Sequence, residues 1–325
     1  MRVLLDTSFT LRPASGTGVY IDRLAAALAA EGVDVVPVAN HRRGAPGHGR
    51  AQSVANLLSD LRWSALELPR LARAARVDVI HHPLPTLSPR APAPQVITVH
   101  DLAFLSLPGM FDPRFARWAH ATHRLAARRA DAVICVSDAT RVELRDRFGV
   151  DGLVAHHGPG QAPDAPPPRL AARHFLYVGD DEPRKDLATL RAAHARLGPG
   201  APPLEIAGGA AQPVSRERLE QLHAAAIALV HPARTEGFGL TVLEAMAMRT
   251  PVIAARCPAT LEVGGHAIVY FEPGDVAALA AEMRRLAGDP AARTALATAG
   301  LARAAAFSWR ASARAHIKAY TLACR

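Results

Sequence analysis

Short apolar runs alternate along the chain with longer segments in which apolar residues recur at helical spacing. The expected strands are 2–6, 34–38, 78–81, 95–100 and 132–136, followed by 175–179, 204–207, 227–231, 251–255 and 267–271. The expected helices between them include 19–30, 115–129 and 277–286. Short strands that are apolar throughout are typical of a sheet covered by helices on both faces. The alternation predicts an α/β fold with parallel sheets.

One segment, residues 158–173, interrupts this alternation. It contains five prolines and two glycines, which cannot continue a helix or a central strand. We interpret it as an interdomain linker between two Rossmann-like domains, over residues 1–165 and 166–310. Ligands of such sheets bind at the carboxyl ends of the strands. Two domains facing each other would therefore place the binding site in a central cleft.

The stretch HPARTEGFGLTVLEAMA, residues 231–247, carries two acids, Glu236 and Glu244, separated by seven residues. Glu236 precedes a glycine-rich turn, and Glu244 lies about one turn into a buried apolar helix. Unbonded N–H groups at the helix start favour an anion, which the glycines allow to approach closely. An ionised carboxylate only accepts hydrogen bonds, so the two acids suit hydroxyl groups attached to that anion. The pattern indicates a nucleotide-sugar.

A second loop, GDDEPRKDL at residues 179–187, follows the first expected strand of the second half. Arg184 and Lys185 could neutralise a diphosphate there, although a solvated surface pair is the alternative. Asp186 can cap the following helix. The acids at 180–182 could bind magnesium, but we favour the interpretation that they hold the loop in place.

In the first half, Gly16 and Gly18 precede a helix expected from about Val19. An ordinary strand–helix turn is the alternative interpretation. His100 ends a strand and could bond a substrate hydroxyl or shuttle a proton, although taken alone a structural role is favoured. The histidine pairs at 81–82 and 156–157 also close strands, and we favour a structural role for both.

Composition narrows the function classes. The chain has 325 residues and a formal charge of +9, with its arginines spread along helical stretches. Zinc-finger spacing and RNA-binding signatures are missing from the sequence, so we expect no nucleic-acid partner. The sequence also lacks a nucleophile elbow, a phosphate-binding P-loop and a zinc-protease motif. The two glycines come ten residues after the first strand, too late for a dehydrogenase fingerprint.

The remaining composition concerns the compartment. Apolar runs fall short of the roughly 18 residues that span a bilayer, and Asp6 comes too early for a secretory signal. Three cysteines without ligand spacing fit a reduced compartment, and we expect a cytoplasmic protein.

Two basic segments combine arginines with large apolar residues. The first carries Phe115, Trp118 and Leu125, and the second spans residues 61–76. Such helices can lie on anionic lipid, which would give a peripheral contact at the inner membrane face. We favour the alternative, in which the apolar stripe faces the core and only the arginines are solvated.

These residues together resemble the retaining family-four glycosyltransferases of the GT-B fold over almost the whole chain. The resemblance is carried by GTGVY (16–20), VHDLAF (99–104), VSDAT (136–140), EPRKDL (182–187), EGFGLTVLEAMA (236–247) and FSW (307–309). Each motif is modest alone, and their order and spacing together are specific.

The resemblance implies a role for each matching residue. Arg184 and Lys185 would bind the donor diphosphate, Glu244 the ribose, and Glu236 the sugar. His100 would contact the transferred sugar near the reacting carbon, which completes a catalytic set of Glu236, His100, Arg184 and Lys185. Donor binding would involve Gly16, Gly18, Arg184, Lys185, Gly237, Phe238, Gly239, Leu240 and Glu244. A helix near 311–322 would cross back to the first domain.

The implied reaction moves a sugar from a nucleotide diphosphate donor to an unidentified acceptor, which could be a small molecule, a glycan or a lipid-linked molecule. The configuration would be retained without a protein nucleophile, and the cation pair would serve in place of a metal, so no cofactor is expected. The alternatives are a GT-B epimerase or phosphorylase and a non-catalytic nucleotide-sugar-binding protein.

The chain also departs from the family pattern. His231 follows Asp186 by only 45 positions, and the segment that helps to frame the nucleotide base, near 208–216, is expected to be shortened. Arg234 stands where a small hydroxyl residue is common. Neither departure removes a proposed catalytic group.

Overall fold

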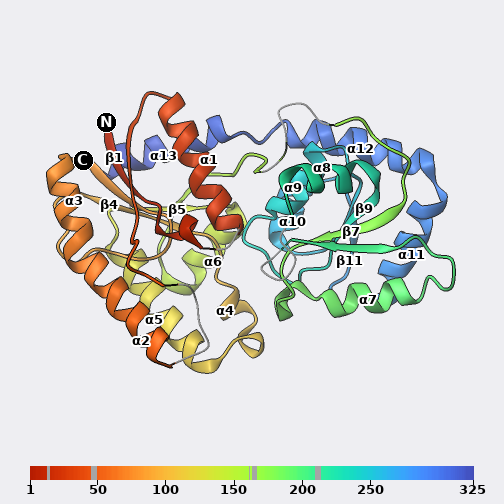
Figure 1. Cartoon of the computed structure of the whole chain (residues 1–325), viewed down its shortest axis with the longest axis horizontal. Helices are drawn as coiled ribbons and strands as arrows, with labels where there is room; N and C mark the ends of the chain where they lie inside the picture. Colours follow the sequence, from red (N-terminus) through yellow and green to blue (C-terminus); the bar gives the residue numbers. More distant parts are fainter. Residues whose placement is uncertain (13–14, 45–49, 161, 163–166, 209–213) are drawn as a thin grey trace. The chain divides into compact units, whose positions relative to one another are not determined.

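The computed structural model describes residues 1–325 except 13–14, 45–49, 161, 163–166 and 209–213. The chain forms two compact units (Figure 1). Unit 1 consists of Met1–Leu105, Asp112–His156 and Trp309–Arg325, and unit 2 of Ser106–Phe111 and His157–Ser308. The predicted domain boundary at 165/166 falls outside the described residues.

Unit 1 is built on a sheet of six parallel strands in the order β2-β1-β3-β4-β5-β6. Its strands are β1 (Arg2–Asp6), β2 (Asp34–Val38), β3 (Val79–His82), β4 (Gln95–Val99), β5 (Ala132–Cys135) and β6 (Leu153–Val154). Its α-helices are α1 (Gly16–Ala30), α2 (Arg50–Arg62), α3 (Leu68–Ala75), α4 (Ala103–Ser106), α5 (Pro113–Arg129), α6 (Asp138–Phe148) and α13 (Trp309–Ala323). Shorter turns are η1 (Ser8–Leu11), the π-helical η2 (Trp63–Glu67) and, in the segment assigned to unit 2, η3 (Pro108–Met110).

Unit 2 contains five parallel strands in the order β11-β10-β9-β7-β8. They are β7 (His174–Val178), β8 (Leu204–Ala207), β9 (Ala226–His231), β10 (Val252–Ala255) and β11 (Val269–Phe271). The helices are η4 (Pro183–Lys185), α7 (Leu187–Ala195), α8 (Arg216–Ala225), α9 (Leu240–Ala247), α10 (Pro258–Gly264), α11 (Val276–Gly288) and α12 (Pro290–Ala304). The predicted α/β class with two Rossmann-like domains is confirmed. The predicted strand ends agree to within two residues, and only the short β6 was not predicted.

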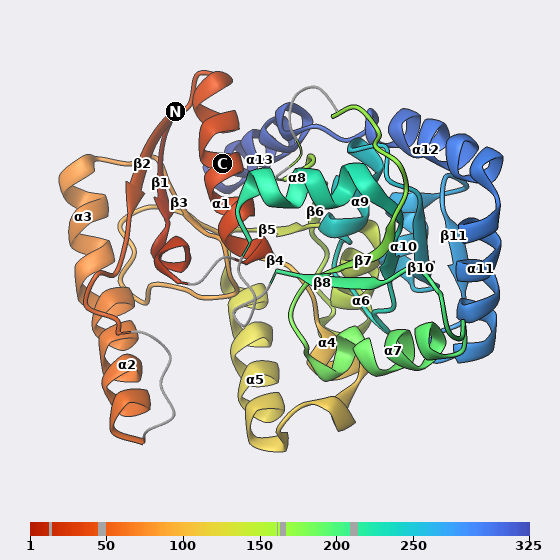
Figure 2. The same ribbon diagram turned by 45° about the vertical axis from the view of Figure 1, so that its right-hand side comes forward.

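The burial of β9 explains why its sequence is apolar from end to end. All six residues, AIALVH, are buried, as expected for a central parallel strand with helices on both faces. Its side chains join a core with β7, β10, α7 and α11. Figure 2 shows α7 and α11 lying beside each other in this unit. The carboxyl end of β9 is thereby held in a fixed position.

Helix α1 begins earlier than predicted. It starts at Gly16 rather than near Val19, because the Ser15 side chain caps it by accepting a hydrogen bond from the Gly18 amide at 3.2 Å. Gly16 and Gly18 therefore form the first helical turn and not a loop in front of it. Side chains cap other helices in the same way, as Asp112 does for α5 and Ser137 for α6.

Helix α13 packs against α1 and the sheet of unit 1, with Ala313, Ala319 and Tyr320 fully buried (Figure 1). A buried hydrogen-bond network holds it there. The Tyr20 hydroxyl lies 2.9 Å from both Thr98 Oγ1 and His316 Nε2, and His81 Nδ1 lies 2.8 Å from the Tyr320 hydroxyl. Buried polar groups in such a network are costly to leave unpaired, so α13 has a specific seat on unit 1.

The exposed face of α5 overturns the favoured interpretation of the first basic segment. In α5 the buried positions are alanines, whereas Phe115, Trp118 and Leu125 are 46%, 58% and 52% exposed. In the second segment, residues 61–76, Trp63 and Leu68 pack into the core as the favoured interpretation expects, and Leu66 and Leu71 are 38% and 41% exposed. The buried face of α5 is thus formed by alanines, and its large apolar side chains lie on the exposed face. Within the described residues, none of the helices is long and apolar enough to cross a membrane.

Candidate active site

Two loops of unit 2 leave the carboxyl ends of neighbouring strands. Turn η4 follows β7, the loop carrying Glu236 follows β9, and these strands pair in parallel. Their ends therefore share one edge of the sheet, where ligands of open α/β sheets bind. There Lys185 Nζ forms a hydrogen-bonded ion pair with Glu236 Oε1. Residues that are 51 positions apart in the sequence thus meet in one cluster.

Three cationic or hydrogen-bonding groups surround the Glu236 carboxylate, whose side chain is only 11% exposed. Besides Lys185, His231 Nε2 lies 3.0 Å from Oε1, and Arg184 Nη1 lies 4.0 Å from Oε2. Burial alone would raise the pKa of Glu236, but the neighbouring Lys185, His231 and Arg184 together lower it far below its usual value. Glu236 is therefore ionised at neutral pH.

The turn that presents Arg184 is fixed by its own contacts. Arg184 Nε donates to Glu182 Oε2 at 2.8 Å, and the Arg184 carbonyl accepts a hydrogen bond from the Arg234 amide at 2.9 Å. Arg234 Nε also donates to Asp186 Oδ2 at 2.8 Å, and Asp186 caps α7 by accepting from Thr189. Because Arg184 and Lys185 are each only 18% exposed, they are not a freely solvated surface pair.

Helix α9 begins directly after this cluster. Its first turn follows Gly239, which has a φ of +92°, a backbone conformation that residues other than glycine rarely adopt. The helix has no side-chain cap, so its first N–H groups remain available to an anion. Glu244 lies in the middle of α9 and is 5% exposed. The charged cluster, the glycine turn and the uncapped amides therefore lie together at the start of α9.

Edge-on aromatic contacts hold the loop that carries Gly237 and Gly239. The Phe238 ring packs edge-on against His157 at 4.9 Å between centroids and against Phe307 at 5.9 Å. Phe238 is 4% exposed, so it anchors the backbone of Gly237 and Gly239 instead of contacting solvent. The FSW motif near the C-terminus thus acts on this loop through Phe307.

The predicted site residues of unit 1 lie at the ends of its own strands and helix. His100 follows β4, and its Nε2 donates to the Pro83 carbonyl at 2.9 Å, because a carbonyl can only accept. Its ring packs edge-on against Tyr20 at 4.9 Å, and burial lowers its pKa. The Gly18 amide is already bonded to Ser15. The roles of Gly16, Gly18 and His100 towards a donor stay predictions.

The acids at 180–182 bind neighbouring groups in the loop. Asp181 lies 3.8 Å from Arg191, Glu182 pairs with Arg184, and the Asp180 carbonyl accepts from the Tyr177 hydroxyl. In the part of the chain that the structure describes, His, Cys, Asp and Glu side chains form no group of three that could hold a metal ion. The shortened segment predicted near 208–216 lies largely outside the described residues.

Sequence reasoning missed two residues of the cluster, His231 and Arg234. The signal for His231 is its place at the end of the buried strand β9. Arg234 was noted as a departure from the family pattern, and its ion pair with Asp186 could not be inferred from spacing.

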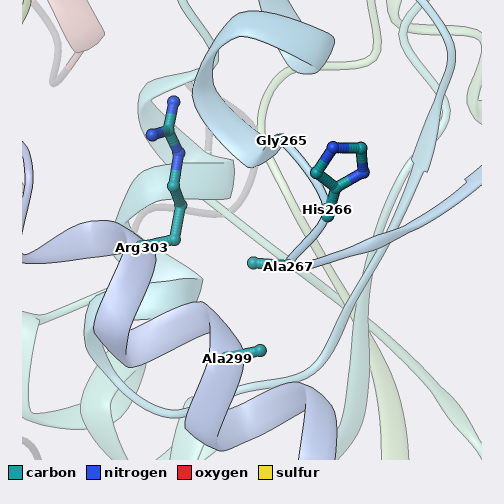
Figure 3. Close-up of a pocket in the computed structure, with 5 residues that line it drawn as sticks. All are labelled: Gly265, His266, Ala267, Ala299 and Arg303. Carbon is teal, nitrogen blue, oxygen red and sulfur yellow. The ribbon is translucent and has the colours of Figure 1, made fainter.

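A hollow of about 410 Å³ lies elsewhere on unit 2, lined by Gly265, His266, Ala267, Ala299 and Arg303 (Figure 3). Arg303 donates to the carbonyls of Glu262 and Val263, which end α10. The guanidinium is thus occupied in holding that helix end, and none of the predicted site residues lines the hollow.

Comparisons with known proteins identify relatives over almost the whole chain. The family model for Glycosyltransferase Family 4 matches residues 14–160, and the model for Glycosyl transferases group 1 matches residues 162–289. O-antigen chain mannosyltransferase B of Escherichia coli is 28% identical over 386 residues, covering 99% of this chain and 100% of that protein.

Solved structures share the fold at lower identity. Sucrose-phosphate synthase from Thermosynechococcus elongatus has a TM-score of 0.80 at 20% identity, covering 99% of this chain and 98% of that chain. Anabaena Alr3699/HepE in complex with UDP-glucose has a TM-score of 0.68 at 16% identity, covering 98% of both chains. The chain belongs to the family 4 and group 1 glycosyltransferases and is a glycosyltransferase of the GT-B fold.

Proposed function

We propose that this glycosyltransferase takes its sugar from a nucleoside diphosphate-sugar donor and transfers it with retention of configuration. The observation that carries the proposal is the cluster of Arg184, Lys185 and Glu236 at the shared edge of β7 and β9. It places two cations and an ionised acid beside the uncapped start of α9. A donor with a diphosphate and several hydroxyl groups matches that combination.

In this proposal the cations act on the leaving group. When the bond between the sugar and the diphosphate breaks, negative charge develops on the departing phosphate. Arg184, Lys185 and the amides at the start of α9 would stabilise that charge as it forms. Without this stabilisation the reaction would be slower, since the loss of a single oxyanion donor lowers kcat by about 10²–10³-fold.

The two acids would recognise hydroxyl groups. Glu236 is ionised and accepts hydrogen bonds only, so it suits a sugar hydroxyl, as the resemblance implies. Glu244, buried on α9, would accept from the ribose hydroxyls. Neither acid is positioned in this proposal as a nucleophile, and we assign none. A same-face attack, with the departing phosphate taking the acceptor's proton, accounts for retention without one.

The names of similar proteins support a nucleotide-sugar donor without identifying it. The Anabaena protein was solved with UDP-glucose, and the E. coli relative is named as a mannosyltransferase. The acceptor is not identified by these names. We expect neither a cofactor nor a metal to be required, because Arg184 and Lys185 would supply the positive charge at the leaving group.

The exposed face of α5 supports a second proposal, a peripheral contact with an anionic membrane. Phe115, Trp118 and Leu125 are exposed on a helix that also carries Arg114, Arg117, Arg124 and Arg128. Large apolar side chains among arginines suit the interface of anionic lipid. A lipid-linked acceptor would then be reached at the membrane surface.

The rival functions are a non-catalytic nucleotide-sugar-binding protein and a GT-B epimerase or phosphorylase. A panel of uridine, guanosine, adenosine and thymidine diphosphate-sugars separates them, read first by thermal shift and then by product analysis. We expect one donor to stabilise the protein and to release its nucleoside diphosphate. Binding without release of the diphosphate would favour the binding protein, and conversion to an isomeric sugar would favour the epimerase.

A further inference from the structure

We propose that Arg12 and Arg43 form a subsite at the carboxyl edge of the unit 1 sheet that binds a phosphate group of the acceptor. The inference rests on the proposed function, because the chain has an acceptor only if it transfers a sugar. Neither arginine belongs to the predicted catalytic set or to the predicted donor-binding set. The subsite gives the unidentified acceptor a chemical class, a molecule that carries a phosphate.

Both arginines follow strands that end side by side. Asp6 ends β1 and is in register with Val38, which ends β2. Arg12 follows η1, the turn after β1, and Arg43 lies in the segment after β2. Because the two strands run in parallel, these segments leave the same edge of the sheet, where ligands of open α/β sheets bind.

The Arg12 side chain is held by packing and not by an acid. Its Cζ lies 4.2 Å from the centre of the Phe9 ring, which packs against the core of unit 1. Within the described residues the guanidinium makes neither a hydrogen bond nor an ion pair, and its Nε is buried. A buried N–H group without an acceptor is costly, so Arg12 has donors available to a ligand.

Arg43 is held from one side only. Its Nη1 forms an ion pair with Asp60 on α2, and its side chain is 21% exposed. Its Nε is buried and lacks a hydrogen-bond partner in the part of the chain that the structure describes. The ion pair therefore fixes the guanidinium and leaves part of its set of donors unused.

The neighbouring acceptor groups at this edge are already engaged. Asp6 accepts from the Ser8 amide through Oδ1 and from Trp63 Nε1 through Oδ2, at 2.9 Å each. Asn40 Oδ1 accepts from one amide and one hydroxyl, at 3.2 Å each. The edge thus has arginine donors left over while these acceptors are occupied, which suits an anion.

The charges of the two arginines favour phosphate over a carboxylate. Burial lowers the pKa of both, and Arg43 lowers the pKa of Arg12 further, whereas Asp6 opposes that shift. A bound dianion would offset this repulsion between the two cations. A phosphate monoester carries about −1.5 to −2 charges at pH 7, and arginine binds phosphate through two parallel hydrogen bonds. A carboxylate carries only one charge.

The strand order separates this subsite from the transferred sugar. In the order β2-β1-β3-β4, two to three strand spacings separate β1 and β2 from β4, which His100 follows. These spacings amount to about 10–14 Å. A phosphate bound there suits the far end of an acceptor, since the proposed function already assigns the donor diphosphate to Arg184 and Lys185.

Isothermal titration calorimetry with inorganic phosphate tests the subsite without any need for turnover. Arg12→Gln and Arg43→Gln each remove one guanidinium. Arg42→Gln is the matched control, because Arg42 is 67% exposed and already pairs with Glu67 at 3.3 Å. Lys185→Ala reports phosphate that binds at the donor site instead. Glucose-6-phosphate, glucose and dodecyl phosphate are titrated in parallel.

We expect the wild type to bind phosphate and glucose-6-phosphate, and not glucose. Arg12→Gln and Arg43→Gln should each weaken this binding about 10- to 100-fold, the range for hydrogen bonds to a charged group. Arg42→Gln and Lys185→Ala should retain the subsite. The tighter binder of glucose-6-phosphate and dodecyl phosphate identifies a free sugar phosphate or a lipid phosphate as the source, and either result supports the subsite.

The melting temperature separates a binding role from a structural one. Without phosphate, Arg12→Gln should melt at or above the wild-type temperature, because it removes an unpartnered buried donor and a like-charge neighbour. Phosphate should raise the melting temperature of the wild type more than that of Arg12→Gln. A destabilised Arg12→Gln with unchanged phosphate affinity would assign Arg12 to a structural role and overturn the inference.

Two further outcomes would also contradict it. Phosphate binding that persists in both arginine variants, or that only Lys185→Ala removes, would overturn the subsite. With an active donor, Arg12→Gln should raise the KM of a phosphorylated acceptor and not that of the donor; a rise for the donor alone would overturn the assignment to the acceptor. If the wild type consumes none of the donors, the proposed function fails and the acceptor assignment fails with it, whereas phosphate binding still decides whether the subsite exists.

Discussion

Substituting both members of the Lys185–Glu236 pair, alone and together, separates their part in stability from their part in turnover. Lys185→Met removes the cation and leaves a carboxylate that is 11% exposed. Breaking a buried pair from one side costs about 3–5 kcal/mol, because the remaining charge is left buried. Glu236 still has His231 at 3.0 Å and Arg184 at 4.0 Å. A charge at 4 Å contributes about 4 kcal/mol at an effective dielectric constant of about 20.

This remaining compensation places Lys185→Met near the lower end of that range, at about 3 kcal/mol. Glu236→Gln leaves Lys185 and Arg184 as neighbouring cations and should cost a similar amount. The double variant removes both charges and should lose only about 1 kcal/mol, since replacing a whole buried pair is often close to neutral. Turnover should fall about 10²–10³-fold in all three, because the donor site lacks its cation, its acid or both.

Urea unfolding and melting temperature measure the stability cycle, and a shift of about 2–4 °C per kcal/mol is expected for domains of this size. The other lysine of the chain, the exposed Lys318, provides a matched control. Lys318→Met should change stability by no more than about 0.5 kcal/mol. Costs that simply add in the double variant would refute the pair, and wild-type turnover in Lys185→Met would refute its place in the donor site.

The remaining predictions concern backbone, pH and surface. Gly239→Ala should destabilise the protein by at least about 1 kcal/mol because of the φ of +92°; an added Cβ has room, since its nearest neighbour is Val242 at 3.8 Å. Gly288→Ala is the control, and equal Tm values for the two variants would contradict the predicted backbone strain. Burial lowers the pKa of His316 from 6.5 to about 4, so between these pH values the unfolded chain binds more protons than the folded chain. The free energy of unfolding should therefore fall by about 3 kcal/mol as the pH drops from 6.5 to 4. Chemical unfolding across pH tests this, and an unchanged slope in His316→Gln would refute it. The protein should co-sediment with anionic vesicles in a salt-sensitive manner that Trp118→Ser weakens and Leu261→Ser does not; no salt-sensitive binding would end the membrane proposal.

The sequence predicts the fold well because its signals are local. A parallel strand buried on both faces must be apolar throughout, so the run that became β9 was visible without any knowledge of its neighbours. The start of α1 was placed late because two glycines outweighed the capping side chain of Ser15 in the interpretation. Helix propensity is a weak guide where a cap decides the boundary.

The site was only partly accessible for a different reason. Arg184, Lys185 and Glu236 could be named from their loops, since strand order brings the carboxyl ends of β7 and β9 together. Which group holds Glu236 depends on side-chain directions at the end of β9, which spacing does not reveal, and His231 was therefore missed. The face of α5 was misjudged because a periodic apolar stripe does not say whether alanines on another face fill the core.

The central claim is that the edge of β7 and β9 binds and activates a nucleoside diphosphate-sugar. Release of nucleoside diphosphate from the donor panel, measured for the wild-type chain and for Lys185→Ala and Glu236→Ala, tests it most directly. The account predicts release from at least one donor by the wild type and a severe loss in both variants, each still folded by circular dichroism. Undiminished release by both variants, or no release from any donor by the wild type, would contradict it.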